Sequence, residues 1–159
     1  MQPVLGYNYG ARRYDRVRAG FKFTTLVCFC YAVSACVVVL NFPMLFINIF
    51  NNDPELTSAG VPAIRLYFCA FWMLFMQMSA QRGFVALGKS RQAIFFSLLR
   101  KAFIVAPLAY ILPRVTGLGV NGVFVAEVVS DVVGSSACFI TFMLTVWPSL
   151  RVTPDSTGR

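Results

Sequence analysis

The feature of the sequence that most constrains the fold is a stretch without any charged residue, from Phe23 to Asn52. It exceeds the roughly 20 residues with which an α-helix crosses the hydrocarbon layer of a membrane. It is also longer than the apolar part of a signal peptide, about 7–15 residues, so we expect it to stay in the mature protein. Of the 159 residues, 58% are hydrophobic and 13% are charged, about half the charged fraction of soluble domains. The sequence therefore predicts an all-α integral membrane protein.

Four membrane-spanning helices are predicted from the apolar runs and the residues that bound them. Pro43 lies near the far end of the first helix, which it kinks or ends, and Pro113 ends the third. The second run is short between Arg65 and Arg82, and it suffices when both side chains reach toward the membrane surface. The helices form one bundle over residues 21–150 and are expected at 21–49, 61–87, 92–112 and 120–147. Residues 1–20 are expected to form the end of a preceding helix and a basic segment, and residues 151–159 a polar tail.

The basic residues predict how the chain is oriented. They precede the first helix, lie between the second and third helices, and follow the fourth, whereas one opposite loop carries Asp53 and Glu55 and the other carries Arg114. Cytoplasmic loops of membrane proteins are enriched in Lys and Arg. Both termini are therefore expected in the cytoplasm, with the chain in a bacterial plasma membrane. The cytoplasmic basic residues are Arg12, Arg13, Arg16, Arg18, Lys22, Arg82, Lys89, Arg91, Arg151 and Arg159.

Several functional classes are excluded by composition. The net charge of +8 comes from short clusters between apolar runs, which does not resemble the continuous basic face of a nucleic-acid-binding protein. The five cysteines all lie within apolar runs and no histidine exists, so neither a disulfide framework nor a zinc site is expected. No nucleophile–base pair is recognisable, and we expect neither an enzyme nor a cofactor.

Two carboxylates stand inside the fourth predicted helix. Glu127 and Asp131 are four residues apart and therefore share one helix face. Ionised carboxylates are costly at membrane depth, so they normally face a cavity or a partner. Two interpretations follow: a pair that titrates protons or contacts a coupling cation, or a structural pair tied to Arg100 or Lys101.

Amides and thioethers mark one side of the second predicted helix. Gln77 and Gln81 share a face, and Met73 and Met76 lie nearby. Such side chains adapt to varied ligands and predict a substrate pocket for small drug-like cations. The alternative is ordinary hydrogen bonding and packing between helices.

Three sequence motifs stand out along the chain. The most specific is Gln2-Pro3-Val4-Leu5-Gly6-Tyr7-Asn8-Tyr9-Gly10-Ala11. The second is Gly83-Phe84-Val85-Ala86-Leu87-Gly88-Lys89. The third is Gly117-Leu118-Gly119-Val120-Asn121-Gly122-Val123, followed by Val129-Ser130-Asp131. Taken in this order, the motifs resemble the MATE (multidrug and toxic compound extrusion) family, in particular its bacterial MepA-like branch.

The resemblance implies a secondary active transporter that exports amphiphilic cations in exchange for H⁺ or Na⁺. The family fold has twelve helices in two lobes, so this chain would correspond to helices nine to twelve, with residues 1–11 ending the eighth. Its expected partners are membrane lipids, small-molecule drugs and the N-terminal lobe. Asp131 matches the family's Ser-Asp pair, whereas Glu127 stands where the family has an uncharged residue. The alternatives are a truncated membrane remnant without transport, or a related flippase or exporter of lipid-linked sugars.

Overall fold

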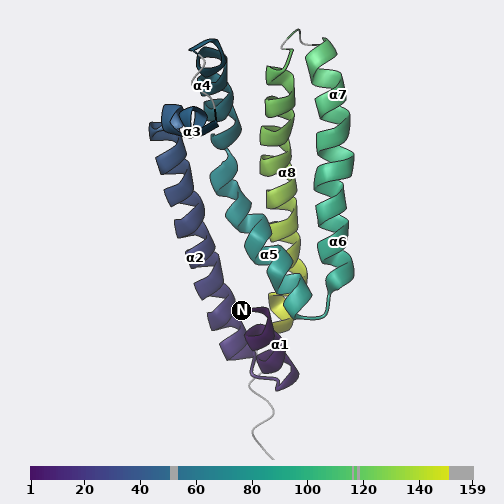
Figure 1. Cartoon of the computed structure of the whole chain (residues 1–159). Helices are drawn as coiled ribbons and strands as arrows, with labels where there is room; N and C mark the ends of the chain where they lie inside the picture. The colour runs from purple at the N-terminus through teal and green to yellow at the C-terminus, as the bar shows by residue number, and fades with distance from the viewer. Residues whose placement is uncertain (51–53, 116, 118, 151–159) are drawn as a thin grey trace, which may run out of the picture.

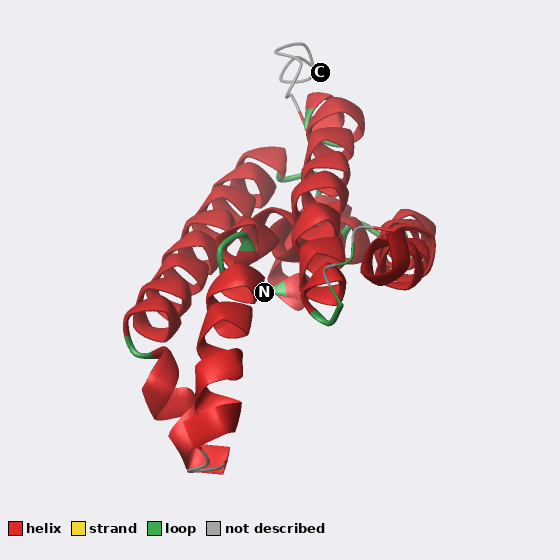
Figure 2. Cartoon of the chain, turned by 90° about the horizontal axis from the view of Figure 1, so that it is seen from above, coloured by secondary structure: helices red, strands yellow, loops and turns green. Residues whose placement is uncertain are grey.

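The computed structural model describes residues 1–50, 54–115, 117 and 119–150, and nearly all of them are helical (Figure 2). Within these ranges no residue lies in a β-strand. The α-helices are α1 (Gln2–Gly10), α2 (Tyr14–Asn41), α3 (Pro43–Phe50), α4 (Pro54–Phe68), α5 (Leu74–Ala86), α6 (Ser90–Leu98), α7 (Ala106–Val115) and α8 (Asn121–Thr145). Two 3₁₀ turns, η1 (Phe71–Met73) and η3 (Pro148–Leu150), and one π-helical turn, η2 (Leu99–Val105), complete them.

Four continuous helical stretches are long and apolar enough to cross a membrane, as predicted: Tyr14–Asn41, Gly60–Ala86, Ser90–Val115 and Asn121–Thr145. They run side by side in Figure 1. Only 11–17% of the most apolar part of the first three is buried, against 39% for the last, which is α8. Most apolar side chains therefore face outward, as lipid contact requires, and α8 lies at the centre of the bundle.

The first predicted helix, at 21–49, is in fact two helices. It begins earlier, at Tyr14, and ends at Asn41, and α3 then starts at Pro43 and turns across the end of the bundle (Figure 1). Proline cannot donate a backbone hydrogen bond, and it disfavours helical geometry in the residue before it. Phe42 accordingly leaves the helical region, with φ −123° and ψ 47°. Pro43 thus ends the span, which was one of the two expected outcomes.

The other boundaries differ less from the prediction. The second span contains a break between Phe68 and Phe71, where α4 gives way to η1 and then α5. The third span begins at Ser90 rather than at residue 92 and continues to Val115, beyond Pro113. The segment before the first span contains a complete short helix, α1, rather than only a helix end, and a turn at Arg12 with φ 56° joins it to α2.

The π-helical turn η2 lies in the middle of the third span, two residues before Pro107. A proline ring crowds the carbonyl four residues earlier and leaves it without its usual donor. A widened turn relieves that crowding, and single π turns within α-helices are frequently found at functional sites. The turn brings two neighbouring basic residues, Arg100 and Lys101, into the middle of an apolar helix.

Tight packing holds the basic end of the bundle together. The Phe21 ring of α2 stacks on the Phe142 ring of α8, with centroids 4.4 Å apart. Gly83 of α5 lies beneath both rings, since a Cβ atom there would be 2.6 Å from Phe142 Cε2 and 3.0 Å from Phe21 Cε2. Three helices thereby meet at one position that only glycine fits.

Candidate functional site

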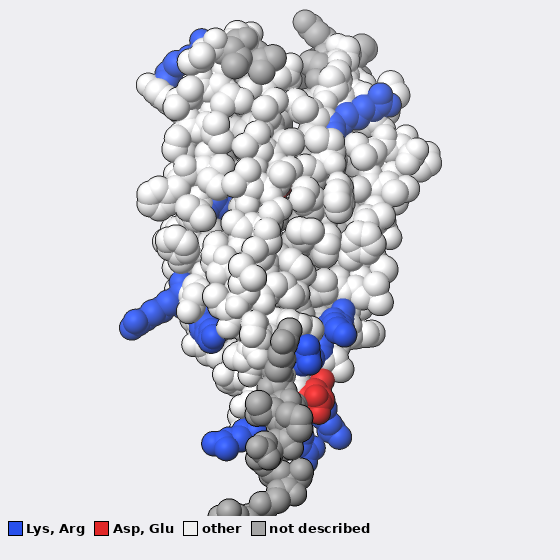
Figure 3. All heavy atoms as spheres, turned by 180° about the vertical axis from the view of Figure 1, so that it is seen from behind, with Lys and Arg blue, Asp and Glu red and all other residues white. Residues whose placement is uncertain are grey.

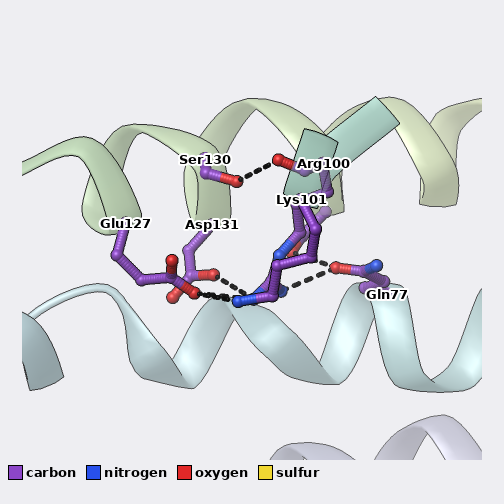
Figure 4. Close-up of polar contacts among 7 residues, drawn as sticks. Gln77, Arg100, Lys101, Glu127, Ser130 and Asp131 are labelled. Carbon is purple, nitrogen blue, oxygen red and sulfur yellow. Dashed lines mark hydrogen bonds and ion pairs between the residues drawn. The ribbon is translucent and has the colours of Figure 1, made fainter. Parts of the chain in front are cut away.

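The candidate site is a group of polar side chains where α5, η2 and α8 face one another (Figure 4). We call it the charge cluster and define it by two cations, two carboxylates and one amide. Its members are Arg100, Lys101, Glu127, Asp131 and Gln77. The formal charges of the two basic and two acidic residues cancel, which lowers the cost of keeping them away from water.

Arg100 is the centre of the charge cluster and only 7% exposed. Its Nη1 donates a hydrogen bond of 2.7 Å to Gln77 Oε1. Its Nη2 lies 3.0 Å from Glu127 Oε1 and 3.0 Å from Asp131 Oδ1. One guanidinium group therefore joins the side-chain amide oxygen of Gln77 on α5 to both carboxylates of α8.

Lys101 adds a second cation at the edge of the cluster. Its Nζ lies 2.6 Å from the same Glu127 Oε1 that Arg100 contacts. The Lys101 side chain is 60% exposed, whereas those of Glu127 and Asp131 are 11% and 2% exposed. Glu127 is thus shared between two cations, and Asp131 depends on Arg100 for its charge partner.

The backbone around Arg100 is shaped to admit its side chain. Ser130 of α8 donates a 3.3 Å hydrogen bond to the Arg100 carbonyl oxygen. Gly134, one turn further along α8, leaves the space that the aliphatic part of Arg100 fills. Small residues let membrane helices approach closely, and here the close approach brings a cation to the carboxylates on α8.

The charge cluster lies near the middle of the third span. Arg100 follows the start of its span at Ser90 by ten residues, or about 15 Å at 1.5 Å per residue. The hydrocarbon layer is about 30 Å thick. Charged residues at such depth are rare and mark ion or substrate pathways.

Two atoms of the cluster are not fully satisfied. Within the described residues, Arg100 Nε and Asp131 Oδ1 are buried and have no hydrogen-bond partner. Asp131 Oδ1 is nevertheless 3.0 Å from Arg100 Nη2, so charge attraction holds this pair without the angle of a hydrogen bond.

The predicted substrate residues separate into two groups. Gln77 and Gln81 line a cavity of about 190 Å³ between α5 and the third span, together with Met78, Ser97, Arg100, Lys101 and Leu74. Met73 and Met76 are partly buried and do not line this cavity. Gln77 also belongs to the charge cluster, which the sequence pattern did not predict because the contact joins two different helices. The feature of the sequence that could have indicated this contact is the pair of basic residues, Arg100 and Lys101, within an apolar run.

The described residues hold no group of three His, Cys, Asp or Glu side chains arranged for a metal ion. The cysteines Cys28, Cys30, Cys36, Cys69 and Cys138 are free thiols in the structure. The two carboxylates of the charge cluster already have Arg100 and Lys101 as counter-ions. The geometry therefore resembles an ion-pair network more closely than a resident metal centre.

Apolar spanning helices around a buried ion-pair network define a polytopic membrane protein. Residues 1–111 match the family model MatE. The chain therefore belongs to the MATE family of multidrug efflux transporters, whose members are transporters and not enzymes. No curated protein sequence matches the chain significantly.

Solved transporter structures share the fold. A multidrug resistance MATE family transporter of the MOP superfamily matches in its outward-facing conformation with a TM-score of 0.83 and 18% identity over 92% of this chain and 32% of that chain. The inward-facing conformation of such a transporter matches with a TM-score of 0.85 and 17% identity over 94% and 34%. The MATE multidrug transporter DinF-BH in complex with R6G matches with a TM-score of 0.80 and 32% identity over 93% and 32%. This chain thus spans about a third of the length of the transporters that it matches.

Proposed function

We propose that the chain forms part of a secondary active transporter that exports amphiphilic cations in exchange for H⁺ or Na⁺. Membership of the MATE family supports this, as does the similarity to a multidrug transporter that binds R6G. The observation that carries the proposal is the buried charge cluster, because ion pairs at mid-membrane depth are costly to keep without a role. Transport requires alternating access to both membrane sides, which repeat-built transporters achieve around a midplane site.

Within this function, we assign ion coupling to Asp131 and Glu127. In the structure Arg100 occupies the place beside both carboxylates that a coupling cation would take. When a proton or Na⁺ binds to Asp131, it neutralises the carboxylate. Arg100 then loses this carboxylate as a charge partner. The guanidinium is then held by Glu127 and Gln77 alone and gains freedom to move.

The cavity beside the cluster gives Arg100 a direction in which to move. Arg100 and Lys101 both line it, and Gln81 and Ser97 offer acceptor oxygens on its wall. A shift of the guanidinium toward this wall would change the contacts between the third span and α8. Ion binding would in this way be linked to a movement of one helix against another.

We assign substrate contact to Gln81 and to Gln77, which lines the same cavity and also belongs to the charge cluster. The cavity of about 190 Å³ is smaller than the 300–1,000 Å³ usual for drug-sized ligands. The side chains on its wall therefore form one side of a larger pocket in this proposal. Met73 and Met76 remain candidates for that pocket through movement of η1 and α5.

The orientation proposed for the chain follows from the basic residues. Most of them gather at one end of the molecule, around α1, the start of α2 and the turn between α5 and α6, and fewer lie toward the opposite end (Figure 3). Since Lys and Arg favour the cytoplasmic side, we propose that both termini face the cytoplasm of a bacterial inner membrane.

The test uses the whole product of the gene, purified and reconstituted in vesicles that contain a fluorescent amphiphilic cation. An imposed proton or Na⁺ gradient should drive export, and the double variant with Glu127→Gln and Asp131→Asn should lose the gradient dependence. Asp15→Asn, an exposed carboxylate at the start of α2, is the matched control and should transport normally. Gradient-independent movement of the dye in the wild type, or none above protein-free vesicles, would contradict the proposal.

A further inference from the structure

A second cavity lies outside the charge cluster, on the side of the bundle where α2 meets α5 and α8. It has a volume of about 360 Å³ and is lined mainly by apolar side chains. We call it the α2 groove. Its lining includes Phe21, Phe29, Phe75 and Met143, with Lys22 and Trp147 at one end.

The groove has a cationic mouth and an apolar interior. Lys22 Nζ lies 5.9 Å from the centroid of the Trp147 ring, and the guanidinium carbon of Arg18 lies 4.6 Å from it. Phe29 follows Lys22 by seven residues along α2, which places it about 10 Å deeper at 1.5 Å per residue. The Phe29 and Phe75 rings meet edge to face there, 5.1 Å apart. Charge and apolar surface are therefore separated along the length of the groove.

The mouth also lies at the level where a membrane changes from headgroups to hydrocarbon. Lys22 is the last charged residue before the charge-free stretch that begins at Phe23. Trp147 lies two residues after the end of α8 at Thr145, and tryptophan is enriched at membrane interfaces. Most basic residues of the chain gather at the same end of the molecule (Figure 3).

We propose that the α2 groove binds an anionic phospholipid, with one acyl chain along the apolar wall and the headgroup phosphate between Arg18 and Lys22. Basic side chains next to a membrane attract anionic lipids, and the separation of charge from apolar lining matches the two parts of a phospholipid. Arg18 and Lys22 both lie near the Trp147 ring at the mouth, so the phosphate has two cations next to it.

The same features exclude other occupants. An amphiphilic cation has the apolar body that the groove requires, but its charge is repelled by Arg18 and Lys22. A free phosphate ion has no partner on the apolar wall and gains nothing from Phe29 or Phe75. A phospholipid fits both the cationic mouth and the apolar interior of the groove. This proposal is independent of the transport function proposed above.

The test exploits the two tryptophans of the chain. In Trp72→Phe the remaining tryptophan is Trp147 at the groove, and in Trp147→Phe it is Trp72, which does not line the groove. Each variant is reconstituted in vesicles of phosphatidylcholine with a rising fraction of phosphatidylglycerol. One lipid at a time carries bromine at the glycerol end of its acyl chains, which is the depth of the groove mouth. Bromine quenches tryptophan fluorescence on contact, so the quenching reports which lipid lies against each ring.

Trp147 should be quenched at several-fold lower fractions of brominated phosphatidylglycerol than of brominated phosphatidylcholine, whereas Trp72 should not distinguish the two lipids. Lys22→Gln should reduce the preference about fivefold, since each basic residue contributes about 1 kcal/mol of attraction. Arg91→Gln on α6, also exposed and basic, should leave the preference unchanged. Equal quenching of Trp147 by both lipids, or a preference that survives Lys22→Gln or falls equally with Arg91→Gln, would overturn the proposal.

Discussion

Gly134 of α8 lies directly against the aliphatic part of Arg100. A Cβ atom at position 134 would be 3.0 Å from Arg100 Cγ and 3.2 Å from its Cβ. The arginine packs this closely against α8 because α8 carries no side chain at this point. The position of the guanidinium at mid-membrane depth therefore depends on a residue that has no charge of its own.

Gly134→Ala should lower stability, because the added methyl group overlaps a side chain that three partners hold in place. Overpacking of this kind costs about 1–3 kcal/mol. The midpoint of thermal unfolding in detergent measures it. Gly10→Ala is the matched control, because a Cβ there meets nothing within 4 Å, and it should change the midpoint little. Equal midpoints for the two variants would mean that Arg100 moves aside without cost.

Arg100→Met should destabilise the protein more strongly than Lys101→Met. Removing the guanidinium leaves Asp131 buried without a cation, and breaking a buried pair costs about 3–5 kcal/mol. Lys101→Met leaves Glu127 with Arg100 as its counter-ion, so the loss of Lys101 should cost less than the loss of Arg100. The comparison is made by denaturant unfolding of both variants in the same detergent.

Adding Asp131→Asn to Arg100→Met should restore a large part of the lost stability, since it removes the unpaired carboxylate. A double-mutant cycle isolates the interaction energy of this pair. Additive losses in the cycle would show that the 3.0 Å contact contributes no coupling.

Gly83→Ala should disrupt the aromatic packing at the basic end of the bundle. The new Cβ would lie 2.6 Å from Phe142 Cε2, and neither Phe142 nor Phe21 has room to withdraw because both are about 2% exposed or less. We expect a loss of at least about 1–3 kcal/mol in thermal unfolding. Val85→Ala, at a 39% exposed position of the same helix, is the control and should stay near the wild type.

The sequence predicted the four spans because a long apolar run has one solution in a membrane, a helix that satisfies its own backbone. The spacing of four residues also correctly predicted that Glu127 and Asp131 share a face, and the structure finds both against Arg100. These features are local, so they can be read from neighbouring residues.

The parts that the sequence did not predict depend on contacts between distant segments. The π turn η2 and the bond from Arg100 to Gln77 require the third span to lie against α5 and α8. Whether Pro43 kinks a helix or ends it depends on what α3 packs against, and α3 meets α4 across the end of the bundle. Met73 and Met76 were grouped with the glutamines because they are near them in the sequence, and the 3₁₀ turn η1 places Met73 outside the helix α5 that carries the glutamines.

Asp131→Asn should separate a structural role from a role in coupling, in the whole gene product in vesicles. The amide keeps the shape of the side chain, and Arg100 retains Glu127 and Gln77 as partners, so the protein should fold and still bind its substrate. If Asp131 exchanges Arg100 for a proton, export by the variant should become insensitive to the pH gradient that drives the wild type. Asp15→Asn again provides the control for a carboxylate outside the cluster. An unchanged pH dependence in Asp131→Asn would remove this residue from the mechanism and leave Arg100 as its structural partner.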